Sequence, residues 1–220
     1  LANAMGAGSV TVLNLFLPMF LQLLLGLGAS DSGLLLMTLM FNFNVGAGIS
    51  GYVTGQVRRY KILPIIGVLL ALVSTLALGF AGDRFGLVAI EALLTIIGLG
   101  FGTVPPMATV ALQNAVERAE LGAATASLNF VRSLAGTLFV GLFGALLAAK
   151  LGSAGVQPGS LSGTLSTTAL AERSALAETF QLVFFGTAAG FALTLVALWR
   201  LEERPLRGGR PTGAPDEPTV

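Results

Sequence analysis

Long hydrophobic stretches alternate along the chain with short polar connections. Five stretches contain no charged residue, and a sixth is interrupted only by Arg132. The five are 1–30, 32–57, 62–82, 92–116 and 179–199, and the sixth is 121–149. A helix needs roughly 20 predominantly apolar residues to cross the hydrocarbon core of a bilayer. The pattern therefore predicts six spanning helices, and it lacks the alternating segments of a membrane β-barrel.

The predicted helices divide the chain into one membrane domain and one tail. The domain covers residues 1–200, and its longest connection is 150–177. Residues 201–220 hold seven Gly or Pro in twenty positions, which predicts a disordered tail. We place the helices at about 6–28, 32–56, 62–81, 86–112, 122–149 and 178–200.

The composition also indicates a lipid environment. Hydrophobic residues make up 54% of the chain and charged residues 10%, and the mean hydropathy is +0.85. A soluble domain carries about 25% charged residues, so this chain has too little polar surface to face water on all sides. We expect an all-α, multi-pass protein of the cell membrane (plasma or inner), with the lipid bilayer as its main partner.

The missing residue types exclude several kinds of chemistry. The chain has no His and no Cys, which removes Cys/His metal sites, Ser-His catalysis and thiol chemistry. Its net charge of +1, without a basic stripe, gives no support for nucleic-acid binding. We therefore expect no metal, no other cofactor and no enzymatic activity.

The basic residues predict the orientation in the membrane. With both ends of the segment in the cytoplasm, the long connection 150–177 is extracellular, and the positive-inside rule is obeyed. The inner side then holds Arg58, Arg59, Lys61, Arg118, Arg200, Arg204, Arg207 and Arg210, and the outer side holds Arg84, Lys150 and Arg173.

Polar residues are unevenly distributed among the predicted helices. The third helix carries no charged or amide side chain, and the sixth carries only Gln181 near its outer end. We expect these two to face lipid and the other four to surround a polar cavity. The candidate cavity-lining residues are Asn14, Gln22, Asn42, Glu91, Asn129 and Arg132.

Arg132 is the most informative of these residues. It lies roughly 15 Å from the start of its helix, too deep to reach the interface easily, and Asn129 is one turn before it on the same face. Arg132 either contacts substrate or ion, or is held by backbone carbonyls or an acid of another helix. Glu91 lies nearer the outer end of its helix, where it is either a cation or proton site or an ordinary interfacial acid.

Prolines and glycines predict breaks and close contacts. Pro18 removes the hydrogen-bond partner of the Asn14 carbonyl, which becomes a free acceptor or is satisfied by a neighbouring helix. Pro105 and Pro106 must bend or break the fourth helix. We expect the glycines of that helix to allow close packing, and a small-residue contact at Gly51 and Gly55 on the second helix. Asn42 is favoured for the cavity over Asn44.

Five segments, in order, resemble one family. They are 17–36, 51–67 (GYVTGQVRRYKILPIIG), 98–116, 121–147 and 178–207. Together they resemble the carboxy-terminal six-helix half of a major facilitator superfamily transporter, in the fourteen-helix drug–proton antiporter branch. Gly51, Arg59, Tyr60 and Lys61 match the family's cytoplasmic signature loop, which departs from the pattern at Gln56 and Arg58. Asn129 and Arg132 match its fifth-helix pattern.

The resemblance implies a fold and a function. The fold is a bundle of two three-helix inverted repeats with substrate near the midplane. The function is proton-coupled export of small hydrophobic or cationic compounds by alternating access, together with the missing amino-terminal half. A chain that begins at Leu1 rather than Met fits such a fragment. A non-transport six-helix scaffold or partner subunit remains the alternative, and a membrane enzyme is disfavoured by the lack of His and Cys.

Overall fold

The chain folds as a bundle of helices. The computed structural model describes residues 2–56, 61–82, 84–153 and 169–200, and all regular structure within them is helical. The elements are α1 (Ala2–Leu23), α2 (Ala29–Gln56), α3 (Ile62–Ala81), α4 (Leu87–Gly102), α5 (Val104–Ala115), the short 3-10 helix η1 (Arg118–Glu120), α6 (Leu121–Ser153) and α7 (Ala169–Arg200).

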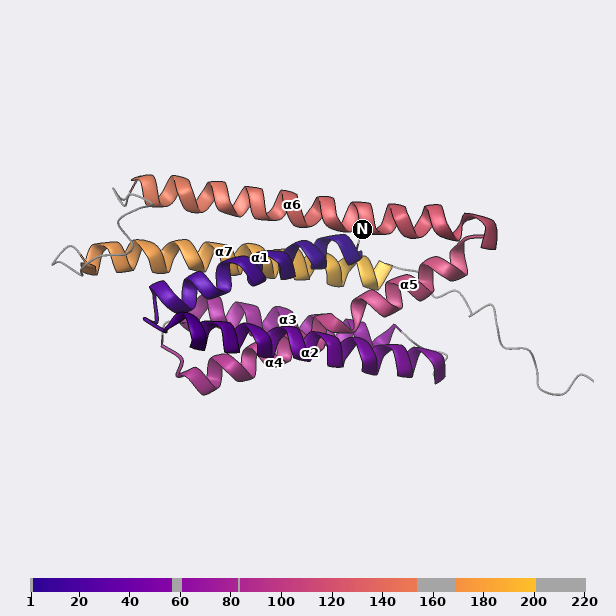
Figure 1. The fold of residues 1–220 in the computed structure, drawn as a ribbon, viewed down its shortest axis with the longest axis horizontal. Helices are drawn as coiled ribbons and strands as arrows, with labels where there is room; N and C mark the ends of the chain where they lie inside the picture. The colour runs from indigo at the N-terminus through magenta and orange to yellow at the C-terminus, as the bar shows by residue number, and fades with distance from the viewer. Residues whose placement is uncertain (1, 57–60, 83, 154–168, 201–220) are drawn as a thin grey trace, which may run out of the picture.

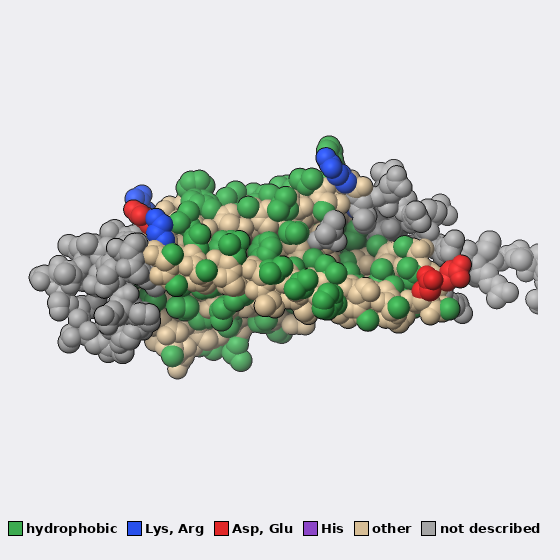
Figure 2. Space-filling model, turned by 90° about the horizontal axis from the view of Figure 1, so that it is seen from above, with side chains coloured by type: hydrophobic (Ala, Val, Ile, Leu, Met, Phe, Trp, Pro, Cys, Tyr) green, Lys and Arg blue, Asp and Glu red, His purple; other side chains and the backbone are tan. Residues whose placement is uncertain are grey.

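Six segments of the described chain are long and apolar enough to cross a membrane, with α4 and α5 counted as one. On the face that Figure 2 shows, hydrophobic side chains cover the middle of the bundle, and the few charged side chains lie toward its ends or at its margin. The predicted all-α membrane fold is confirmed.

Two helix ends differ most from the sequence-based boundaries. α1 ends at Leu23 rather than near residue 28. Gly26 follows with φ of +68°, a left-handed conformation that favours glycine, and the Leu27 amide donates to the Leu21 carbonyl at 3.2 Å. α7 begins at Ala169 instead of residue 178. Part of the predicted 150–177 loop is therefore helical, whereas 154–168 and the predicted tail 201–220 lie outside the described residues.

The helix pairs follow the symmetry of two three-helix repeats. α1 packs on α6 and α7, α4 packs on α2 and α3, and α3 packs on α7. Exchanging the first three spans for the last three maps α1–α6 onto α4–α2 and α1–α7 onto α4–α3, and it leaves α3–α7 unchanged. In Figure 1, α6 lies on one side of α1, and α2 and α4 lie on the other.

Glycines let α4 approach two neighbours closely. A Cβ on Gly102 would meet the Phe43 carbonyl of α2, and one on Gly98 would meet the Leu39 carbonyl of the same helix. On another side of α4, Gly100 faces Gly67 of α3, backbone against backbone. These glycines serve helix packing, as their spacing predicts.

Gly48 and Gly51 of α2 do not make such close helix contacts. Nothing lies within 4 Å of the Cβ position of Gly48 or Gly51. The small-residue contact expected at Gly51 is therefore not formed among the described residues, and the side of Gly55 is not described. The two glycines lie on an open face because α2 packs on α4 through its opposite side, at Leu39 and Phe43.

α3 and α7 form the other side of the bundle. The rings of Phe80 and Phe185 meet edge to face with centroids 4.9 Å apart, and Gly79 of α3 lies against Phe184 and Phe185 of α7. The large hydrophobic side chains that α3 leaves exposed are Ile62, Ile66, Leu69, Leu70, Val73 and Phe80. An apolar outer surface of this kind fits contact with acyl chains.

We expect Gly102→Ala to destabilise the bundle, because its methyl group would collide with the Phe43 carbonyl. Overpacking of this kind costs about 1–3 kcal/mol. Gly33→Ala in α2 is the matched control, since nothing lies within 4 Å of its Cβ position. The measurement is the temperature at which half of the detergent-purified protein aggregates. A Gly102→Ala variant as heat-stable as Gly33→Ala would contradict the packing.

Candidate functional site

The bundle contains a cavity of about 760 Å³. It lies where α1 and α6 face α2 and the α4–α5 break. Its lining residues are Asn3, Ala7, Val10, Thr11, Asn14, Leu15, Met40, Phe43, Phe101, Pro105, Arg132, Ser133, Gly136, Thr137 and Val140. Cavities of about 300–1,000 Å³ are the usual size for drug-sized ligands.

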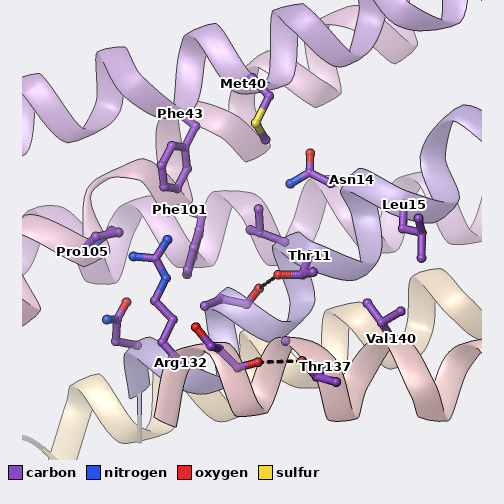
Figure 3. Close-up of a pocket in the computed structure, with 15 residues that line it drawn as sticks. Thr11, Asn14, Leu15, Met40, Phe43, Phe101, Pro105, Arg132, Thr137 and Val140 are labelled. Atoms are coloured by element: carbon purple, nitrogen blue, oxygen red, sulfur yellow. Dashed lines mark hydrogen bonds between the residues drawn. The ribbon is translucent and has the colours of Figure 1, made fainter. Parts of the chain in front are cut away.

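Most of the cavity wall is apolar. Phe43 of α2 and Phe101 of α4 lie beside each other with ring centroids 6.0 Å apart, and Met40 lies on the same side (Figure 3). Val140 of α6 closes the opposite side (Figure 3). Such a wall can hold the hydrophobic body of a ligand without fixing its orientation.

Two amide side chains of α1 interrupt the apolar wall. Asn3 and Asn14 both line the cavity, and the Oδ1 atom of each is buried without a hydrogen-bond partner among the described residues. An unsatisfied buried oxygen costs about 1–3 kcal/mol. Because Pro18 lacks an amide hydrogen, the Asn14 carbonyl also loses its helical donor. α1 therefore carries acceptors that a ligand or water can satisfy.

Arg132 supplies the only charge among the described lining residues. Figure 3 shows its side chain extending from α6 toward Phe101 and Pro105. Within the described chain its guanidinium has no hydrogen bond and no ion pair. Of the alternatives left open by the sequence, ties to backbone carbonyls or to an acid are thus not observed in this part of the chain.

The break between α4 and α5 shapes one side of the cavity. The helix is interrupted at Thr103, just before Pro105 and Pro106, and Pro105 lines the cavity. The Thr103 hydroxyl donates to the Gly100 carbonyl at 2.7 Å. The buried hydroxyl of Ser50 on α2 donates to the Thr103 carbonyl at 2.8 Å. A neighbouring helix therefore holds the break in place.

Four of the predicted cavity residues do not line the cavity. Gln22 and Glu91 are exposed and lie away from it. Asn42 lies between α2 and α4 instead, where its Nδ2 donates to the Thr38 carbonyl at 2.8 Å and to the Thr95 hydroxyl at 3.4 Å. Asn44 bonds the Met40 carbonyl on its own helix and is exposed. Helix periodicity identified the polar residues of α2 but not which side packs on α4.

Asn129 is the fourth residue. It is exposed and lies one turn from Arg132 on the same side of α6, beyond the cavity's described lining. Arg132 and Asn14 are therefore the two predicted cavity residues that the structure brings to one cavity.

The predicted signature loop is only partly described. Arg59 and Tyr60 lie outside the described residues, and Gly51 is exposed at the end of α2. The Lys61 ammonium donates to the Trp199 carbonyl at 3.0 Å, near the end of α7. A cation at a helix C-terminus is favourable, so Lys61 ties the start of α3 to the end of α7.

Sequence reasoning missed several lining residues. Asn3 stands close to the start of the sequence, outside the first predicted helix, and Thr11 shares a face of α1 with Asn14 at a spacing of three. The spacing of Thr11 and Asn14 could have identified Thr11 from the sequence, because residues three apart on a helix are neighbours. The aromatic residues Phe43 and Phe101 carry no sequence signal that separates a cavity wall from ordinary core.

Comparison with known proteins gives relatives whose names describe transport, efflux or drug resistance. No model of a known protein family matches the chain. It is 36% identical over 145 residues to the "Multidrug transporter protein MdtP" of Bacillus subtilis, covering 63% of this chain and 25% of that protein. It is 32% identical over 142 residues to the "Aspyridones efflux protein" of Neocamarosporium betae, covering 62% and 24%.

A third relative differs in its coverage. The "Tetracycline resistance determinant" of Streptomyces rimosus is 26% identical over 146 residues, covering 66% of this chain and 41% of that protein. An "Uncharacterized MFS-type transporter" of Mycobacterium tuberculosis is also similar. The chain spans about a quarter of the length of the first two relatives.

We expect Ser50→Ala to loosen the α4–α5 break, because the Thr103 carbonyl loses the hydroxyl that bonds it. The loss of one hydrogen bond of this kind is worth about 1 kcal/mol, which lowers the melting temperature by about 2–4 °C. Thr38→Ala on the same helix is the control, because its hydroxyl bonds only the Leu34 carbonyl of its own helix and is exposed. Equal melting temperatures for the two variants would contradict the role of Ser50.

Proposed function

Because this chain belongs to the major facilitator superfamily, we propose that it forms one half of an exporter of small hydrophobic compounds that works by alternating access. The observation that carries the proposal is the cavity between α1, α2, the α4–α5 break and α6, the spans that correspond in the two repeats. Transporters built from inverted repeats place substrate at the interface of those repeats, near the bilayer midplane.

The chemistry of the cavity supports transport over catalysis. Its wall offers aromatic surface, one cation and two amide oxygens that no described residue hydrogen-bonds. Among the described residues no carboxylate lines it, and no group of acids there could hold a metal ion. These groups can bind and release a small molecule, but they do not form an acid–base pair.

The missing half is the second part of the proposal. In the spans of α2 and α6 only 22% and 17% of the residues are buried, against 44% to 61% in the other four. Asn44 on α2, and Asn129 and Ser133 on α6, are exposed. Polar groups of this kind are costly against acyl chains. We infer that α2 and α6 pack against a second six-helix unit, which also closes the cavity.

Proton coupling and orientation complete the proposal. Because no described carboxylate lines the cavity, the acids that would exchange protons are expected in the second half, with Glu91 outside the pathway. The distribution of Lys and Arg in the sequence supports an orientation with both ends of the segment in the cytoplasm. Membership of the fourteen-helix drug–proton antiporter branch fits both points.

The proposal predicts that Asn14→Ala impairs export from cells that express the full-length protein. Removal of a polar contact to a bound ligand costs about 1–2 kcal/mol, so the initial efflux rate of a fluorescent substrate should fall about tenfold. Gln22→Ala is the matched control, because it lies two turns further along α1, is exposed and does not line the cavity. Membrane expression of both variants is measured alongside.

Three outcomes decide the proposal. A loss of efflux in Asn14→Ala alone supports it. Equal efflux in both variants removes Asn14 from the pathway. A full-length protein that moves no compound across a membrane, although it is well expressed, would favour the alternative of a six-helix scaffold or partner subunit.

A further inference from the structure

Arg132 is a permanent cation that faces an apolar cavity without a counter-ion in the described chain. Its guanidinium has five hydrogen-bond donors in a planar fork, and it does not lose its proton in proteins. Such a group binds carboxylates, sulfonates and phosphates with two parallel hydrogen bonds. Arg132 itself is exposed in the described chain, so its donors are accessible to a ligand that enters the cavity.

We propose that Arg132 forms an anion subsite, and that this half of the cavity selects hydrophobic compounds with a negatively charged group over cationic ones. The inference rests on the proposed function and deepens it, because it names the substrate class of the same site. It departs from the hydrophobic or cationic class that the family resemblance implied.

The surroundings of Arg132 define the shape of the ligand. Arg132 extends in the direction of Phe101 and Pro105 in the view of Figure 3, and all three line the cavity, so the body of a bound anion can pack on Phe101 and Phe43. Asn14 lies further along the cavity, near Met40 and Leu15 (Figure 3). The ligand therefore has an aromatic or aliphatic body with an anionic group at one end.

The far end of the cavity adds a second requirement. The Oδ1 atom of Asn14 has no donor among the described residues, so a ligand with a hydroxyl or amine hydrogen at its other end can satisfy it. Such a bond would be neutral and weaker than the charge-assisted contact at Arg132. Arg132 therefore sets the charge preference, and Asn14 contributes to orientation.

A cation is disfavoured by the same groups. Among the described lining residues there is no carboxylate that could neutralise it, and Arg132 would repel it. Glu91, the predicted cation site on the fourth helix, is exposed and lies away from the cavity.

Three probes that share one ring system test the inference. They are naphthalene-2-sulfonate, naphthalene-2-sulfonamide and naphthylmethyl-trimethylammonium, which are anionic, neutral and cationic. Their binding is measured by calorimetry to the full-length protein in lipid nanodiscs. We expect the sulfonate to bind at least tenfold more tightly than the ammonium compound.

Variants separate the subsite from general effects. Arg132→Gln should weaken sulfonate binding about tenfold and change sulfonamide binding less than twofold, whereas Arg132→Lys should keep part of the preference. Arg84→Gln is the control, because this substitution also removes one positive charge. Arg84 is exposed in the connection between α3 and α4.

The outcomes distinguish this inference from the function on which it rests. Binding of the neutral or cationic probe with no preference for the sulfonate would overturn the anion subsite and leave the transport proposal standing. Unchanged sulfonate binding in Arg132→Gln would also overturn the subsite. If no probe binds the wild-type protein and no compound is exported, the proposed function itself fails.

Discussion

A permanent charge inside a membrane-spanning helix must be solvated by something other than lipid. Arg132 lies eleven residues after Leu121, about 16 Å into α6 at 1.5 Å per residue. A cation at the centre of a spanning helix costs about 2.5–3.5 kcal/mol even on insertion scales. Since no described residue pairs with it, the cavity that it faces must supply water, ligand or a group from elsewhere. The interpretation of α6, of the cavity and of the proposed second half depends on this constraint.

The rest of the bundle keeps that cavity in shape. α4 approaches the backbone of both α2 and α3 through glycines, which leaves these three helices little freedom to shift. The α4–α5 break is then fixed by Ser50, and it brings Phe101 and Pro105 to the cavity opposite α6. The repeat symmetry gives α1 a corresponding place, and α1 contributes Pro18 and Asn14, whose Oδ1 has no partner in the described part of the chain. α1 and α4 each pack closely on some of their sides, and this leaves another side of each helix free to line the cavity.

The sequence predicted the elements more completely than their contacts. Charge-free runs predict six spans because lipid excludes charge, and this holds for any arrangement of the helices. Arg132 and Asn14 stood out because they are polar within such runs. The choice between Asn42 and Asn44 failed, because it depends on which side of α2 packs on α4, and the glycines that decide this belong to α4. The end of α1 was misplaced because the apolar run continues past Gly26, where the backbone turns.

The most direct test of the central claim is the reactivity of cysteines placed along one stretch of α6, in a chain that has none. Ser133 and Thr137 line the cavity, whereas Leu134 and Leu138 lie one residue further on and are also exposed. Residues 133 and 134 have nearly the same depth in the membrane, and so do residues 137 and 138. Because the thiolate forms only where water reaches, cysteines at 133 and 137 should react at least tenfold faster with a membrane-impermeant thiol reagent than those at 134 and 138. Equal rates, or faster reaction at 134 and 138, would show that the Arg132 side of α6 does not face an aqueous cavity.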